Sequence, residues 1–317
     1  MLENQKLNQI GEWIKRNARP LEIARYEYHF ENGSKENVLR CLSQFQNADG
    51  GFGYGLEADN WNPNSTPLTS SIALKILYET GFREKNGMIT KCMDYLSGNY
   101  FDNQRGTWAT VIPSNNSYAH APWWTWEEGG RNTWDFNPSI EIAGFMIYYS
   151  DEDALSSKIA NLCFRKAEEY LFSENQLSKN FHEVYCYLHG LLLANQVRNK
   201  VSANIKSMEE KIKEYIEATI CRDSEKWLTS YVAQPIDFMN LLNEDDLLIV
   251  QGYRSEIVKN AQLLIDALPM NGVWDITWTW NGNYQEVFEK ARVIWQAIFA
   301  IEKLLKFRRL GLIEGHS

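Results

Sequence analysis

Apolar residues recur along this chain at intervals of three and four positions, which is the spacing of an amphipathic helix. One set of segments carries Lys, Glu and Arg along one side and apolar residues along the other. This arrangement predicts helices with one solvated face, which should lie on the outside of the fold. The segments are residues 35–46, 88–97, 155–172, 203–220 and 255–268.

A second set of segments alternates with the first and is apolar on most sides, which predicts helices buried on both faces. These segments are residues 67–80, 138–149, 181–195, 231–242 and 284–305. Pro67 and Pro138 begin two of them, and proline is favoured there because the first turn of a helix leaves its amide hydrogens unused. Residues 4–16 and 20–31 form a further pair. Residues 273–280 alternate briefly, as a short strand or loop ribbon does.

Six successive helix pairs predict an all-α fold, an (α/α)6 toroid in which inner helices surround an axis and outer helices surround them. No Gly/Ser-rich or Pro-rich linker interrupts residues 1–317, so we expect a single domain. The loops repeat as well, because Gly50-Gly51-Phe52, Gly106-Thr107-Trp108 and Gly272-Val273-Trp274 each follow an outer helix. Glycine tolerates the positive φ at which many helices end, and the aromatic ring can then pack between neighbouring helices.

The segment Gln46-Asn47-Ala48-Asp49-Gly50-Gly51-Phe52-Gly53 resembles the repeat motif of squalene–hopene cyclases and protein prenyltransferase β-subunits. A shortened copy is Gln104-Arg105-Gly106-Thr107-Trp108, and residues 272–274 keep the last part. Through the helix pairs, the resemblance to this terpenoid cyclase and prenyltransferase superfamily covers most of the chain. It implies an α/α toroid in which the motif ties outer helices together. Residues 53–70 and 120–124 also resemble uncharacterised bacterial proteins of this toroid type.

The catalytic residues of that superfamily do not carry over to this chain. Its cyclases use an Asp-x-Asp-Asp acid, and the nearest string here is Asn243-Glu244-Asp245-Asp246, which is typical of a solvated turn. Its prenyltransferases hold zinc through Asp, Cys and His, whereas residues 51–59 offer acids with no cysteine after them. We therefore predict no metal site and no cofactor.

Composition narrows the class of partner and the compartment. The chain has 317 residues and a net charge of −9, which argues against a nucleic-acid partner because phosphate binding requires clustered Lys and Arg. Five scattered cysteines form no metal or disulfide pattern and are typical of a reducing compartment. The first residues lack the apolar core of a signal peptide, and no stretch approaches the roughly 20 apolar residues of a membrane span. We expect a cytoplasmic protein without an integral membrane span.

Tryptophan placement indicates a ligand site. Nine of the 12 tryptophans lie in two loop regions that follow outer helices, where exposed aromatic surface is normally avoided. In a toroid both regions would meet at one rim and form an aromatic pocket. Trp108 and Trp274 are better explained as structural side chains that plug the mouth of the ring. The candidates for ligand binding are Trp61, Trp123, Trp124, Trp126, Trp278 and Trp280.

Acidic residues lie among these rings, and an acid pressed against apolar surface has a raised pKa, which suits a general acid. The predicted catalytic residues are Asp59, Asp135 and Asp275, which come from three loops. The alternative role for Asp59 and Asp135 is helix capping, since both precede helices. Glu57, His120 and Glu141 are predicted to bind substrate. His182, His189 and the first inner helix are expected to line the central cavity without assigned roles.

Three functions fit these patterns. The first is a terpene cyclase- or prenyltransferase-like protein that binds an isoprenoid, whose carbocations aromatic faces would stabilise. The second is a carbohydrate-active enzyme related in chemistry to glycoside hydrolases, because tryptophan stacks on sugars and the loops are rich in asparagine. The third is a non-catalytic module that binds a peptide or protein. The first two imply a small-molecule partner.

Overall fold

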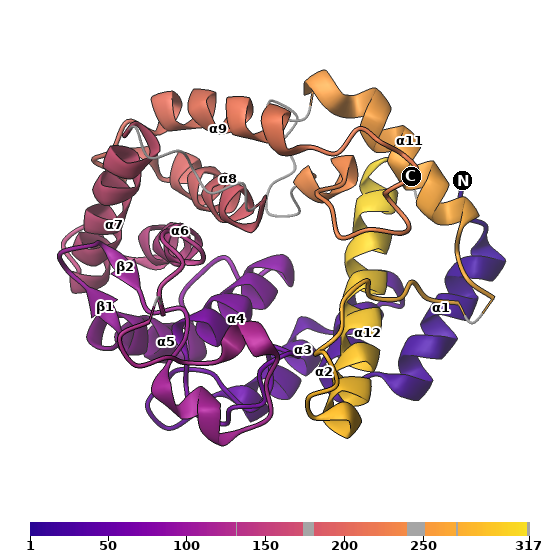
Figure 1. Ribbon diagram of the computed structural model, residues 1–317, viewed down its shortest axis with the longest axis horizontal. Helices are drawn as coiled ribbons and strands as arrows, with labels where there is room; N and C mark the ends of the chain where they lie inside the picture. Colours follow the sequence, from indigo (N-terminus) through magenta and orange to yellow (C-terminus); the bar gives the residue numbers. More distant parts are fainter. Residues whose placement is uncertain (131, 174–180, 240–250, 271, 316–317) are drawn as a thin grey trace. The chain divides into compact units, whose positions relative to one another are not determined.

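The computed structural model describes residues 1–130, 132–173, 181–239, 251–270 and 272–315. Helices account for 60% of the structure (Figure 1), so the predicted all-α class is confirmed. The chain forms two compact units, of which unit 1 comprises Met1–Gln44 with Ile220–Ser317 and unit 2 comprises Phe45–Thr219. The closure of the helix pairs into a toroid and the single domain remain predictions.

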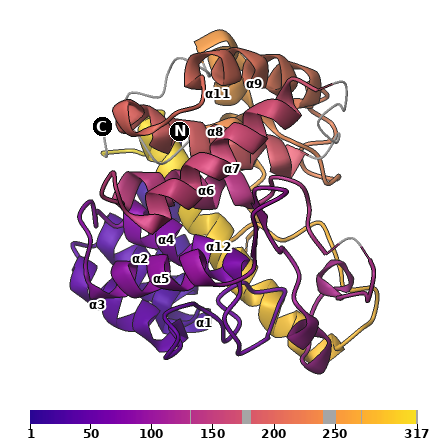
Figure 2. The same cartoon turned by 90° about the vertical axis from the view of Figure 1, so that its left-hand side faces the viewer.

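Unit 2 consists of two layers of helices. Within each layer, successive helices contact one another, and each helix of one layer also packs against its sequence neighbour in the other. Figure 1 shows the two layers, and Figure 2 shows the same helices from the side. One layer contains α4 (Pro67–Glu79), α6 (Ser139–Tyr149) and α8 (Phe181–Gln196), and the other contains α5 (Gly87–Gly98), α7 (Leu155–Leu171) and α9 (Ile205–Thr219). This is the alternation that the sequence predicts.

The two layers differ in burial as their sequences predict. Nine of the 11 residues of α6 are buried, whereas only four of the 15 residues of α9 are. The buried residues of α9 are spaced by three or four positions, at Ile205, Met208, Ile212 and Ile216, and so form one apolar stripe. The predicted difference between apolar and amphipathic helices is therefore confirmed in unit 2.

Helices α6 and α8 approach each other backbone to backbone. A Cβ atom added at Gly144 would lie 2.7 Å from the Cα of Gly190, and one added at Gly190 would lie 2.4 Å from the carbonyl oxygen of Ile140. Only glycine permits such a distance at both positions, because real Cβ atoms do not approach a backbone so closely. The crossing point of the two helices is therefore determined by these two glycines.

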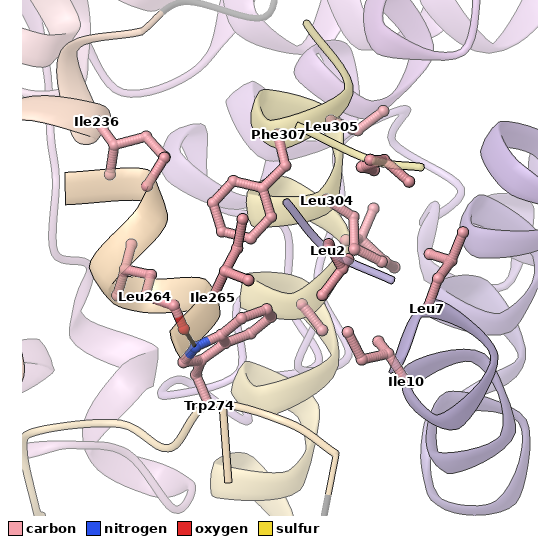
Figure 3. Packing of buried hydrophobic residues seen from close by; sticks show 14 of the residues in the cluster. Leu2, Leu7, Ile10, Ile236, Leu264, Ile265, Trp274, Leu304, Leu305 and Phe307 are labelled. Atoms are coloured by element: carbon pink, nitrogen blue, oxygen red, sulfur yellow. Dashed lines mark hydrogen bonds between the residues drawn. The ribbon is translucent and has the colours of Figure 1, made fainter. Parts of the chain in front are cut away.

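Unit 1 combines the first and last helices of the chain. Its helices are α1 (Asn4–Asn17), α2 (Pro20–Phe30), α3 (Lys35–Leu42), α11 (Arg254–Asp266) and α12 (Gln285–Arg309). Side chains from α1, α11 and α12 form one core with Leu2 and Trp274 (Figure 3). Leu2 also pairs with Ile313 in a parallel bridge, which ties the two ends of the described chain together.

One segment differs from its predicted structure, and a second adopts one of its two predicted alternatives. In residues 231–242, the described part contains a 3-10 turn, Pro235–Phe238, in place of a helix. Pro235 and a capping box between Gln234 and Asp237 place the start of this turn at residue 235, so residues 231–234 lie outside it. Residues 273–280, predicted as a short strand or a loop ribbon, form a loop: Asp275 accepts a hydrogen bond from the amide of Ile276, and no strand in the described residues pairs with the segment.

Short elements complete the described structure. The strands β1 (Phe101–Asp102) and β2 (Thr107–Trp108) pair antiparallel, with Phe101 opposite Trp108. The remaining 3-10 helices are η1 (Ser43–Phe45), η2 (Pro113–Ser117), η3 (Pro122–Trp124), η4 (Arg198–Lys200) and η6 (Gln251–Tyr253).

Helix α6 begins at Ser139, one residue after Pro138. The turn predicted at residues 243–246 lies outside the described residues. Among those residues, no helix is long and apolar enough to cross a membrane.

Candidate functional site

The tryptophans of the repeated glycine-marked loops belong to the core. Trp108 donates its indole hydrogen to the carbonyl of Leu96 at 2.8 Å, and Trp274 donates to the carbonyl of Leu264 at 2.8 Å. Each acceptor lies two residues before the end of the preceding helix, where carbonyls lack a partner within the helix. Figure 3 shows this contact for Trp274. Both copies therefore perform the same structural task, as expected for these two residues.

The first glycine-marked loop is fixed by close contacts. The side-chain amide of Gln46 donates to the carbonyls of Gly50 and Met88, which joins the loop to the start of α5. A Cβ atom at Gly50 would lie 2.3 Å from the carbonyl oxygen of Lys91, and φ is +91° there. The ring of Phe52 is fully buried. These contacts give the loop a packing role.

Two loops of unit 2 that the sequence singles out lie side by side. Asn60 forms a backbone bridge with His120, and the amide of Ala121 donates to the carbonyl of Asp59 at 2.8 Å. This pairing buries predicted acids: Glu57 is 5% and Asp59 3% exposed. Residues 57–61 and 118–126 are therefore neighbours within unit 2.

His120 is engaged at both ring nitrogens. Its Nδ1 lies 2.6 Å from the carbonyl oxygen of Tyr118, and its Nε2 lies 3.1 Å from Oγ1 of Thr125. Since a carbonyl only accepts, Nδ1 carries the hydrogen and Nε2 accepts from the threonine hydroxyl. This arrangement orders the turn that follows the loop.

The tryptophans of unit 2 divide into packed and open rings. Trp124 is 6% exposed and stacks on Trp134, with ring centroids 4.8 Å apart. Trp61 donates its indole hydrogen to the carbonyl of Ala58 at 2.9 Å. Trp126 is tied to Asn116 through its backbone, while Trp123 is 37% exposed. Among the predicted binding residues in these loops, Trp123 therefore presents the most open ring.

Neither Asp59 nor Asp135 caps the helix that follows it. The N-cap of α4 is Thr66, whose hydroxyl accepts from the amide of Thr69. The N-cap of α6 is Pro138, with no side-chain cap. Asp135 has φ of +48° and its carboxylate accepts a hydrogen bond from the hydroxyl of Tyr170 at 3.3 Å. The capping alternative for these two acids is therefore wrong.

In unit 1, Asp275 forms an ion pair with Arg292 of α12. The guanidinium Nε lies 2.8 Å from Oδ1, its Nη2 bonds to Oδ2, and the side chain of Gln296 donates to Oδ1 at 3.1 Å. The hydrogen bond from Arg292 is the main reason that the pKa of Asp275 lies below its ordinary value. Asp275 is therefore a carboxylate at neutral pH, and the raised pKa expected of a general acid is not found there.

Next to this ion pair, an aromatic cluster surrounds Trp278. Its ring centroid lies 5.7 Å from Tyr231, 5.6 Å from Trp295 and 5.7 Å from Phe299. The ammonium of Lys303 lies 4.5 Å from the centroid of Phe299, and burial lowers the pKa of Lys303 to about 8. We call Tyr231, Trp278, Trp295 and Phe299 the Trp278 cluster.

The other residues of this loop and of α12 belong partly to the core and partly to the candidate site. Trp280 is 1% exposed and contacts Phe288, so this predicted binding residue belongs to the core. The sequence prediction missed Tyr231, Phe299 and Lys303. The available signal was the spacing of residues 292, 295, 296, 299 and 303 by three or four positions, which places them on one face of α12.

In unit 2, Glu141 of α6 and His189 of α8 form a hydrogen-bonded pair, with Nδ1 and Oε1 2.7 Å apart and each side chain 13% exposed. The hydroxyl of Ser71 points to the other carboxylate oxygen at 3.5 Å. Burial raises the pKa of Glu141, but the hydrogen bond and charge of His189, with the charge of Lys75, outweigh it, so the pKa is lowered overall. The pair thus stabilises the ionised carboxylate.

Replacing Glu141 by glutamine should reduce the dependence of stability on pH. A carboxyl whose pKa is lower in the folded than in the unfolded protein stabilises the fold above the unfolded pKa, roughly 4.3. That contribution disappears as pH falls through the folded pKa. Urea unfolding should show Glu141→Gln about 1 kcal/mol less stable at pH 7, with the difference shrinking as pH falls below about 4. Glu152→Gln, at an exposed carboxylate, is the control. Parallel pH profiles for the wild type and Glu141→Gln would contradict the expectation.

Comparison with known proteins gives no assignment: neither protein families nor curated proteins match this chain. Within the described part of the chain, no three His, Cys, Asp or Glu side chains are grouped so that they could hold a metal ion. An open groove of about 620 Å³ follows α11 beside Lys259 and Gln262, and no predicted site residue lines it. The candidate sites therefore rest on the contacts described above.

Proposed function

We propose that this protein binds a small polar molecule of carbohydrate type on the Trp278 cluster of unit 1. The observation that supports this proposal is the group of exposed Tyr231 and three partly exposed aromatic rings near the Asp275–Arg292 ion pair. Tyr231 is 53% exposed, and the side chains of Asp275 and Arg292 are 42% and 40% exposed. Aromatic surface left open beside polar groups of fixed geometry is typical of a ligand site.

The chemistry of these groups suits a sugar. The flat faces of Trp278 and Tyr231 offer apolar area to the C–H face of a pyranose ring. The carboxylate, guanidinium and amide groups of Asp275, Arg292 and Gln296 are planar, and each can bond to hydroxyl groups at the edge of the ring. Because the three polar groups already hold one another, little side-chain entropy is lost when a ligand binds.

An isoprenoid remains the second candidate. The rings of the Trp278 cluster would stabilise a carbocation, and Lys303 and Arg292 would attract a diphosphate. A cyclase reaction that begins by protonation requires a neutral acid, however, and the pKa values of Asp275 and Glu141 are both lowered. This difference favours the carbohydrate over the isoprenoid.

The proposal extends to the fold and the compartment. In it, the layered helix pairs of unit 2 are part of an (α/α)6 toroid, which their alternation supports. The protein acts in the cytoplasm, and the five free cysteines, four of them buried, suit a reducing compartment.

Titration of intrinsic fluorescence and calorimetry with oligosaccharides and with farnesyl diphosphate test the proposal. We expect an oligosaccharide to bind, and Trp278→Ala and Tyr231→Ala each to weaken binding by about tenfold or more, as central aromatic contacts do. Phe172→Ala, at a 49% exposed ring in unit 2, should leave binding unchanged. If farnesyl diphosphate bound and no oligosaccharide did, the ligand would be an isoprenoid and not a carbohydrate. Saccharide binding that survives both cluster variants would show that the ligand binds elsewhere.

A further inference from the structure

We propose that His189 is a general base in a second site, built within unit 2 by α4, α6 and α8, and that it activates water for the hydrolysis of a small ester. This inference goes beyond the ligand site of unit 1 and does not depend on it. It rests on the orientation of His189 by Glu141, on the glycine contact that positions the pair, and on the open side of the ring.

The carboxylate of Glu141 determines which nitrogen of His189 carries the proton. An ionised carboxylate only accepts hydrogen bonds, so the nitrogen 2.7 Å away, Nδ1, is the donor. In the neutral ring Nε2 then has a free lone pair. That nitrogen is not among the buried atoms of the described residues that lack a partner. A histidine held in this way by a carboxylate is prepared to take a proton at Nε2.

The backbone contact between α6 and α8 fixes the distance within the pair. Gly190 directly follows His189, and Gly144 lies one turn after Glu141, so the two side chains start next to the closest approach of the helices. Because the backbones there are in contact, neither side chain can drift by a helix movement. Such rigid support is what a catalytic pair requires, since small displacements lower the rate strongly.

The surroundings of His189 are polar and partly open. On α8, His182, Tyr185 and His189 are partly exposed at intervals of three and four residues, whereas the residues between them are mostly buried. Tyr185 lies 6.5 Å from His189 between ring centroids. From α4, Lys75 acts on Glu141 with its positive charge, and Ser71 points to the same carboxylate. A pair that served only to fill the core would not continue along α8 as a row of partly exposed polar residues.

This geometry supports the hydrolysis of an ester with water as the only co-reactant. Water attacks the carbonyl carbon of the ester while Nε2 of His189 removes one of its protons. Glu141 stabilises the imidazolium that forms, and the positive charge of Lys75 favours the negative charge that develops on the carbonyl oxygen. The bond from carbon to the alcohol oxygen then breaks, and the proton passes from Nε2 to that oxygen. The products are a carboxylic acid and an alcohol.

Hydrolysis of p-nitrophenyl acetate by the full chain at pH 7.5 provides the test. We expect His189→Gln to lower kcat/KM by about tenfold or more, while His182→Gln, on the same partly exposed side of α8, changes it little. Circular dichroism and urea midpoints of both variants show whether each is folded. Equal rates for the wild type and folded His189→Gln would overturn the proposal, as would an equal loss in His182→Gln.

A second measurement distinguishes catalysis from a structural role and does not require replacing the histidine. Glu141→Gln keeps the ring and the shape of the pair but removes the negative charge. Glu141→Gln should therefore lower kcat and leave KM nearly unchanged, because the lost negative charge acts on the imidazolium that forms during the reaction. A folded variant with unchanged kcat would contradict the role of His189, as would one in which only KM rises.

Discussion

Gly190→Ala should lower the free energy of unfolding by about 3 kcal/mol. The new methyl group would lie 2.4 Å from the carbonyl oxygen and 2.9 Å from the carbonyl carbon of Ile140, so α6 and α8 must separate. Alanine is intrinsically better in a helix than glycine by about 1 kcal/mol. A net loss of stability therefore means that the clash costs more than this gain. The sign of the measured change thus shows whether the two helices are in close contact. Urea unfolding at pH 7 provides the measurement.

A matched substitution separates the two effects. Gly98 lies at the end of α5, and a methyl group added there would have no atom within 4 Å, so Gly98→Ala should leave stability unchanged or raise it slightly. Gly144→Ala addresses the same crossing as Gly190→Ala. The double variant should lose less than the sum of the two single losses, because one separation of the helices relieves both clashes. A Gly190→Ala protein as stable as Gly98→Ala would show that the two helices cross elsewhere.

Trp108→Ala should lower the free energy of unfolding by about 4 kcal/mol. The indole ring is 0% exposed, lies 4.5 Å from the ring of Phe101 between centroids, and donates to the carbonyl of Leu96. Its removal would leave a large cavity and a carbonyl at the end of α5 without its partner. Chemical unfolding followed by circular dichroism measures the loss.

Two further variants show which part of the indole matters. Trp108→Phe keeps an aromatic ring but removes the hydrogen bond, so it should cost roughly 1–2 kcal/mol, well below the alanine variant. Trp123→Ala removes the same indole group at a position that is 37% exposed and should cost roughly 1–2 kcal/mol, less than half the cost of Trp108→Ala. If Trp108→Ala were as mild as Trp123→Ala, the glycine-marked loop would not have the packing role described here.

The helices were the most predictable part of this protein. Eleven α-helices of the described residues correspond to predicted segments, and most ends agree within one or two residues. The reason is local: apolar spacing and a cap such as Thr66 before Pro67 act within one turn of the chain. The described part of residues 231–242 departed from its pattern because Pro235 and the capping box of Gln234 and Asp237 place the start of the 3-10 turn at residue 235, after residues 231–234.

The candidate sites were only partly predictable. The sequence singled out Asp275 as an acid among tryptophans, but its ionisation depends on Arg292, 17 residues later on α12. Glu141 was named as a binding residue without its partner His189, which is 48 residues away. Trp61, Trp124 and Trp280 stood out as loop aromatics, although the structure packs their rings against neighbouring groups. Composition shows which groups are available, and only contacts between distant segments show their charge and exposure.

The sequence by itself determined the class of fold, the order of its helices and which of them are buried, because these follow from interactions between residues three or four positions apart. The tertiary structure decided which side chains form pairs. The approach of Gly144 to Gly190 places His189 against Glu141, and the packing of α12 places Arg292 against Asp275. Such pairings depend on helix crossings and loop paths. The pKa of a group and the exposure of a ring are therefore determined only when those neighbours are in place.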